Sequence, residues 1–223
     1  MRVRLQSGET AFGLSLMKFT LTYDGELRSN KPKAKWGIRQ QLSPQLAELW
    51  RVDPVLLNLT RNRLIPATDG FMTIDVHHTR DGTRPAPQAP SNPIDLCEPV
   101  SKGGWTFIPL VRERLALHCG LKITFLRKEG PGKVYQGGDM DNRLKTLFDA
   151  LSVPNAHQLI SGAPSPDPIY CLLEDDSLIA GINIETGRLL SRPGASEAEV
   201  RLIIEVDVRV TQARAYNHIF LGD

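Results

Sequence analysis

The sequence has little of several features that mark whole classes of protein. No apolar run approaches the ~20 residues that a transmembrane helix needs, so no membrane span is expected. The 3 cysteines, Cys97, Cys119 and Cys171, are odd in number, unclustered and without metal-ligand spacing, which excludes a disulfide scaffold and a zinc site. A net charge of +2 provides no general field for nucleic acid, so any DNA contact has to come from local patches.

The first 17 residues are too polar for the core of a signal peptide. This polarity, together with cysteines that are expected to be reduced thiols, predicts a cytoplasmic protein that does not contact membranes. The length of 223 residues fits one enlarged domain or a domain with an appendage.

One short acidic stretch carries most of the functional signal. Asp139 and Asp141 stand at the start of a predicted helix, and Lys145 follows Asp141 by one turn on the same face. An apolar stripe supports the helix, with a Gly-Gly breaker before it and Pro154 after it: Met140, Leu144, Leu147, Phe148 and Leu151. Asp139 is well placed as the helix N-cap.

A second acidic group, Glu174-Asp175-Asp176, follows an apolar run further along the chain. Clusters of carboxylates with a nearby lysine suit hard divalent cations such as Mg²⁺, and such sites commonly hydrolyse phosphodiesters. Each residue also has an ordinary explanation. Asp139 is then only a cap, Asp141 and Lys145 form a surface ion pair, and Asp175-Asp176 opens a turn.

The pattern Asp-x-Asp-Asn-x-x-Lys-x-x-x-Asp-Ala-Leu, followed by a strand that ends in Asp-Asp, resembles the RusA family of Holliday junction resolvases. The matching region covers about 121–210. The resemblance implies that Asp139, Asp141 and Asp176 bind Mg²⁺, with Mn²⁺ as a substitute, and that Lys145 assists catalysis. Asp175 is the alternative third ligand. It also implies a homodimer acting on branched DNA with four-way junctions.

The chain departs from that family in two places. The region 154–168, rich in Pro, Ser, Gly and Ala, separates the helix from the second acidic group and reads as an inserted loop. The basic run expected before Asp139 is replaced by Tyr135-Gln136-Gly137-Gly138. Two other functions therefore stay open. One is a different metal-dependent phosphoryl or glycosyl transferase that uses the Asp-x-Asp motif, and the other is a DNA-binding protein without catalysis.

A basic segment at 30–39 is the candidate for DNA contact outside the acidic motif. It carries Lys31, Lys33, Lys35 and Arg39 around Trp36 and is predicted to be a loop that binds phosphates, although a solvated basic loop explains it equally well.

The remaining pattern predicts an α+β fold, a mixed sheet with helices packed on one face. Strands are expected at 17–23, 71–76, 121–127 and 199–210, and helices at 44–59, with an interruption at Asp53-Pro54, and at 109–119. The adjacent His77 and His78 face opposite sides and are not expected to form a metal site. A Pro-rich connector at 82–99 separates an N-terminal elaboration, 1–100, from a RusA-like catalytic core, 101–223. The elaboration belongs to the same domain or is an appendage.

Overall fold

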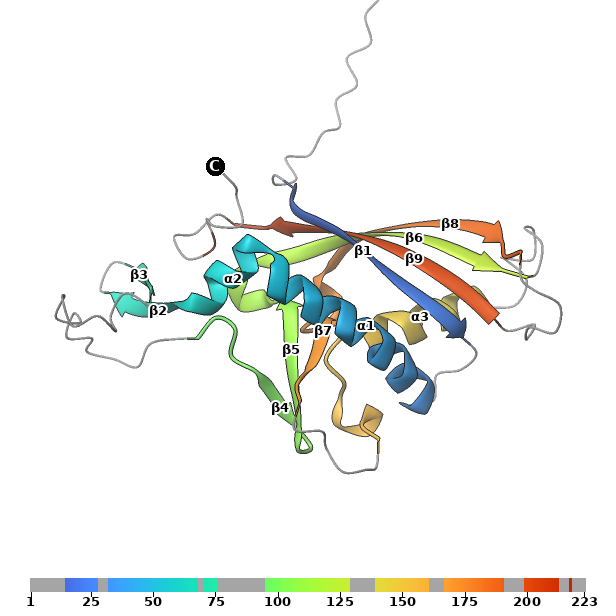
Figure 1. Ribbon diagram of the computed structural model, residues 1–223, viewed down its shortest axis with the longest axis horizontal. Helices are drawn as coiled ribbons and strands as arrows, with labels where there is room; N and C mark the ends of the chain where they lie inside the picture. Colours follow the sequence, from blue (N-terminus) through green and yellow to red (C-terminus); the bar gives the residue numbers. More distant parts are fainter. Residues whose placement is uncertain are drawn as a thin grey trace, which may run out of the picture.

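The computed structural model of the chain describes residues 15–27, 32–67, 70–75, 95–128, 139–160, 167–190, 199–212 and 217 (Figure 1). The predicted positions Lys31, His77 and His78, and the stretch 82–94 of the connector, lie outside these residues. The elements follow in this order along the chain: β1 (Ser15–Glu26), α1 (Pro32–Val52), α2 (Pro54–Arg61), β2 (Asn62–Ala67), β3 (Gly70–Asp75), β4 (Val100–Lys102), β5 (Trp105–Val111), η2 (Glu113–Leu115), β6 (Leu117–Arg127), α3 (Asp139–Leu151), η3 (Ala156–Gln158), β7 (Ile169–Leu173), η4 (Asp176–Leu178), β8 (Ile179–Arg188) and β9 (Glu199–Val210).

The largest sheet among the described residues has four strands in the order β1-β9-β6-β8. β9 pairs antiparallel with both β1 and β6, whereas β8 runs parallel to β6, so the sheet is mixed. Period-two patterning explains why these strands form. Along β9 every second residue is apolar and buried: Val200, Leu202, Ile204, Val206, Val208 and Val210. The prediction of this strand is confirmed with the same bounds.

The helices α1 and α3 lie on one side of this sheet, and no described helix or strand covers its other face (Figure 1). A second mixed sheet has the order β4-β5-β7, with β4 antiparallel and β7 parallel to β5. β2 and β3 form a separate antiparallel hairpin. The predicted α+β class with mixed sheets is confirmed.

The N-terminal part belongs to the same core as the rest of the chain. β1 pairs with β9 along its whole length, and α1 contributes buried side chains such as Ile38, Leu42 and Leu46 to the cluster that contains the inner face of the sheet. The strand predicted at 17–23 is therefore an edge strand of the main sheet.

The predicted loop at 30–39 is wrong, because α1 begins at Pro32 and continues through Pro44 to Val52. Pro44 lacks the N–H that would bond the carbonyl of Gln40. Gln40 is exposed, so water can satisfy that carbonyl and the helix continues. The expected interruption at Asp53 is confirmed. The Asp53 side chain accepts bonds from the N–H groups of Val55 at 2.9 Å and Leu56 at 3.1 Å, which caps α2.

The predicted helix at 109–119 is also wrong. This segment holds the end of β5, the short turn η2 and the start of β6. Alternate residues of β6 are buried from Leu117 onward, and this period extends the one predicted at 121–127. Pro109 fits within β5 because β4 pairs only with residues 105–107, so no described strand pairs with Pro109 on that side.

None of the helices in the described part of the chain combines the length and apolarity needed to cross a membrane.

Candidate functional site

The helix α3 forms where the sequence predicts it and exposes the predicted polar residues. Its apolar stripe, including Met140, Leu144 and Leu147, packs into the core. Asp141, Asn142 and Lys145 are exposed. Lys145 follows Asp141 by four residues and Asn142 by three, so its side chain neighbours each of them on the helix surface. α3 begins at Asp139, whose side chain lies outside the described part of the structure, so its capping and metal-binding roles stay predictions.

The second acidic group follows β7, and its three members differ in their surroundings. Glu174 is held in place, since its N–H donates to the Val111 carbonyl at 2.9 Å and its carboxylate accepts from the Glu113 N–H at 3.1 Å. Asp175 caps the turn η4 by accepting a bond from the Ser177 N–H at 3.0 Å. Hydrogen bonding to Ser177 lowers the pKa of Asp175 below its usual value. Asp176 is exposed in η4.

The end of α3 is tied to the strand that leads into this acidic group. Ser152 forms a parallel bridge with Leu173, the last residue of β7, and the Val153 N–H donates to the Leu173 carbonyl at 3.0 Å. The turn η4 also contacts α3. The element that carries Asp176 therefore lies beside the helix that carries Asp141 and Lys145, although about thirty residues separate them.

The donor set at these elements is oxygen only and open to solvent, which suits a hard cation such as Mg²⁺. Within the described side chains, no three carboxylate, histidine or cysteine groups are close enough together to hold a metal ion, and the Asp139 carboxylate is not among those side chains. The oxygen ligands at these elements fit Mg²⁺, while the joint binding of one ion by Asp139, Asp141 and Asp176 remains a prediction.

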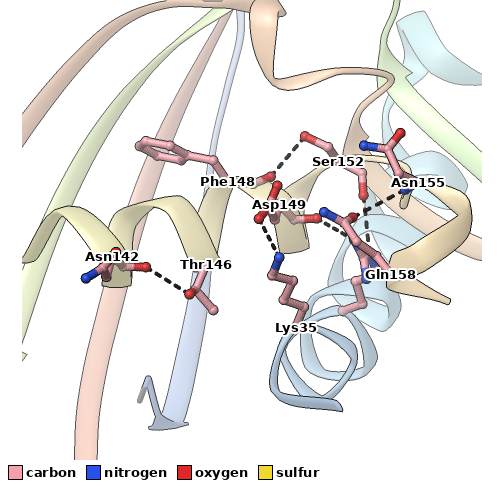
Figure 2. A network of polar contacts seen from close by, with 9 residues as sticks. Lys35, Asn142, Thr146, Phe148, Asp149, Ser152, Asn155 and Gln158 are labelled. Carbon is pink, nitrogen blue, oxygen red and sulfur yellow. Dashed lines mark hydrogen bonds and ion pairs between the residues drawn. The ribbon is translucent and has the colours of Figure 1, made fainter. Parts of the chain in front are cut away.

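Among the described side chains, Lys145 forms none of the ion pairs that would give it a purely structural role. No salt bridge joins it to Asp141 or Asp149 among the described side chains. Asp149 pairs instead with Lys35 of α1, at 2.6 Å between Nζ and Oδ2 (Figure 2). Lys145 lies exposed on α3, and its expected partner Asp149 is paired with Lys35.

The placement of Lys35 and Arg39 corrects the DNA contacts predicted for them. Both side chains are buried, at 4% and 1% exposure, and face α3 rather than solvent. A phosphate needs an accessible cation, so neither residue can serve as such a contact in this conformation. Of the four predicted basic residues, Lys33 is exposed and Lys31 is not described.

Arg39 binds the C-terminal end of α3. Its Nε donates to the Ser152 carbonyl at 3.2 Å, and its Nη2 donates to the Asp149 carbonyl. Cations stabilise a helix C-terminus because the last carbonyl groups lack intrahelical partners and carry partial negative charge. Burial lowers the pKa of Arg39, and the Asp149 carboxylate opposes that shift. Two buried cations of α1 thus hold the end of the helix that carries the acidic motif.

The sequence contained a signal for this contact that the loop prediction missed. Lys35, Ile38, Arg39, Leu42 and Leu46 recur at helical spacing and are all buried in α1. If Lys35 and Arg39 are counted together with the apolar residues, the spacing predicts a helix whose buried face includes two cations near its start.

A hollow of about 520 Å³ lies across the face of the main sheet opposite α1 and α3, and no residue of the acidic motif lines it. Its floor includes the facing glycines Gly120 and Gly181, above which space is open. The carboxylate of Glu205 there lies 3.3 Å from Lys122, and the nearby Asp207 carboxylate lies 2.6 Å from Arg209. These carboxylates already have cationic partners, so this hollow is a poorer candidate for a metal site than α3 and η4.

Comparison of the chain with known proteins found no matching family model, no similar curated protein and no similar solved structure. The likeness to the RusA family therefore rests on the motif residues alone.

We expect Lys35→Met to lower the free energy of unfolding by about 3 kcal/mol, because it leaves Asp149 without its partner. The expected loss is at the low end of the range for breaking a buried ion pair, because the Asp149 side chain is still 16% exposed. Urea unfolding measures the change. The exposed Lys33→Met is the matched control and should shift stability by less than about 0.5 kcal/mol. Equal effects of the two variants would contradict the assignment, and Lys35→Met with Asp149→Leu should recover part of the loss.

Proposed function

We propose that the protein is a Mg²⁺-dependent endonuclease that cleaves branched DNA by phosphodiester hydrolysis. The observation that carries this proposal is the contact between η4, which bears Asp176, and α3, which exposes Asp141 and Lys145. Carboxylates from separate parts of the chain can ligate one cation together when they lie on neighbouring elements. The motif's likeness to the RusA resolvases adds the four-way junction as substrate and a homodimer as the acting form.

Each residue has a separate role in this proposal. Asp139, Asp141 and Asp176 would hold the cation, and Asp175, whose carboxylate caps η4, would keep Asp176 turned to solvent. When bound, a divalent cation supplies an activated water and offsets charge at the scissile phosphate. Lys145 adds a positive charge that favours the transition state as negative charge redistributes over the phosphoryl oxygens.

Substrate contact would come from exposed cations near these elements. Lys145 lies on the solvent face of α3, and Lys33 is exposed near the start of α1. With a net charge of +2 for the chain, binding should depend on these local cations and weaken as salt increases.

Asp141→Asn should abolish Mg²⁺-dependent cleavage of a synthetic four-way junction while the fold survives. The amide keeps the size of the side chain and removes the anionic ligand, so metal affinity should fall by at least about tenfold. Cleavage of junction, flap, duplex and single-stranded DNA is measured with and without Mg²⁺, and circular dichroism checks folding. Glu48→Gln, which neutralises an exposed carboxylate on α1, is the control. Wild-type rates in Asp141→Asn would remove the metal assignment.

The two aspartates of the second group should separate stability from activity. Asp175→Ala should cost about 1 kcal/mol by removing a cap, whereas Asp176→Ala should leave stability unchanged and abolish cleavage. Because the folded-state pKa of Asp175 is lowered, its contribution is present above its unfolded pKa and is lost as pH falls through the folded value. The stability gap between wild type and Asp175→Ala should therefore close in acid. Unimpaired cleavage by Asp176→Ala would identify another third ligand.

Lys145→Ala should reduce the cleavage rate at saturating enzyme by roughly 10²–10³-fold, the usual cost of removing one group that stabilises transition-state charge. Metal and junction affinity should change little. Single-turnover rates and binding curves on the same variant test this, with Lys18→Ala on β1 as an exposed control. Near-normal turnover would show that Lys145 has no catalytic role.

A further inference from the structure

The two edges of the main sheet differ in how their backbone groups are used. At β1, the Gln45 side-chain amide accepts from the Thr22 N–H at 3.0 Å and donates to the Thr22 carbonyl at 2.8 Å. Gln41 does the same at Asp24, at 3.3 and 3.0 Å. An edge strand left open presents free N–H and C=O groups to which another strand can pair. Two glutamines of α1 occupy those groups, so the β1 edge is closed at Thr22 and Asp24.

The opposite edge, β8, has no such cover among the described residues. β8 is the last strand in the sheet order and pairs only with β6 (Figure 1). Ala180, Gly181, Ile182 and Asn183 are all exposed. The stretch 179–184 contains no charged residue and no proline, which are the residues that usually protect an edge strand. This part of β8 is therefore competent to pair with another strand.

Two exposed apolar side chains lie on β8 and just beyond its end. The described residues include three large exposed hydrophobics, Val52 at 51%, Ile182 at 48% and Leu190 at 89%. Ile182 lies in β8, and Leu190 follows it where the chain still runs beside β6, since the Leu189 N–H donates to the Arg127 carbonyl at 2.7 Å. Ile182 and Leu190 are an even number of residues apart, so in an extended chain they face the same side.

We propose that β8 pairs antiparallel with β8 of a second copy of this chain, about a two-fold axis at Thr186. In this register Ile182 lies opposite the partner's Leu190, and Leu190 lies opposite the partner's Ile182. A two-fold interface makes each contact twice. Both exposed side chains are thereby covered by one arrangement, and the two main sheets become one.

The same register also avoids unfavourable pairs. Glu185 lies opposite the partner's Gly187, and Arg188 lies opposite the partner's Ile184, which its alkyl stem can cover. No two like charges stand directly opposite one another, an arrangement that would be destabilising. Thr186 meets its own copy, and Thr-Thr pairs are favourable across antiparallel strands.

This inference does not rest on the proposed nuclease activity. It concerns backbone groups and apolar side chains of β8, and it would stand if the protein cleaved no DNA. Its tests measure assembly and not catalysis, so a failed cleavage assay would leave the β8 interface standing. The homodimer is common to both proposals, and a protein that cleaves DNA as a monomer would remove the interface and the homodimer while leaving the metal-dependent cleavage.

A cysteine at the two-fold axis tests the register. Directly opposed residues of an antiparallel pair have Cα atoms roughly 4.5–5.5 Å apart, within the roughly 4.4–6.8 Å that a disulfide spans. In a Cys97→Ser background, Thr186→Cys should therefore give a covalent dimer on mild oxidation, seen by non-reducing electrophoresis. Thr22→Cys, exposed on the closed β1 edge, is the matched control and should stay monomeric.

Sedimentation equilibrium tests the assembly itself. The wild-type protein should sediment as a dimer, and Ile182→Lys, which places a charge on the exposed edge, should sediment as a monomer with an unchanged circular dichroism spectrum. Thr124→Lys on the central strand β6 should remain dimeric. A monomeric wild type, a dimeric Ile182→Lys, or equal cross-linking of Thr186→Cys and Thr22→Cys would each overturn the proposal.

Discussion

The burial of one face of the main sheet is the constraint on which the rest of this structure depends. Alternate residues of β1, β9 and β6 point to the same side, and their apolar side chains can leave water only if something covers them. α1 and α3 provide that cover, and both contribute to the same core cluster. Because the apolar stripe of α3 has to face the sheet, Asp141 and Lys145 have to face solvent. The position of the candidate site is thus a consequence of packing the core.

Buried charges then fix the position and rotation of α3, which apolar packing alone would leave adjustable. An apolar stripe tolerates some sliding and rotation of a helix, whereas a buried ion pair tolerates little, because separating its members strands a charge away from water. Lys35 and Arg39 of α1 bind the side chain and carbonyl of Asp149 at the last turn of α3. Ser152 and Val153 then bond to Leu173. One end of α3 is therefore joined to α1 and to β7, whose continuation carries Asp175 and Asp176.

The two sheet edges show how one helix can decide what a surface is able to do. α1 lies along β1 and donates and accepts through Gln41 and Gln45, so that edge has no free groups at Thr22 and Asp24. No helix lies along β8 in the described structure, and an apolar side chain stays exposed there. The candidate metal site and the open edge are connected through the chain, since η4 leads directly into β8. A dimer built on β8 would place two such sites in a fixed relation.

Local patterns in the sequence determined the elements whose period is regular over many residues. β9 and α3 follow from alternation and from a helical stripe between a Gly-Gly breaker and a proline, since burial on one side enforces those periods. The exposed face of α3 follows from the same stripe. The segment 109–119 was predicted wrongly because it contains two strand ends and a turn, and over so short a stretch the spacing of its apolar residues fits a helix equally well.

Only the tertiary structure decided the role of Lys35 and Arg39. A basic side chain is expected to face solvent unless its partners are known, and here the partners, a carboxylate and a carbonyl of α3, are more than a hundred residues away in the chain. It also decided between Asp175 and Asp176 as the capping residue and between β1 and β8 as the open edge. These features depend on contacts between segments that are far apart in the chain, and the spacing of apolar residues within one segment contains no information about such contacts.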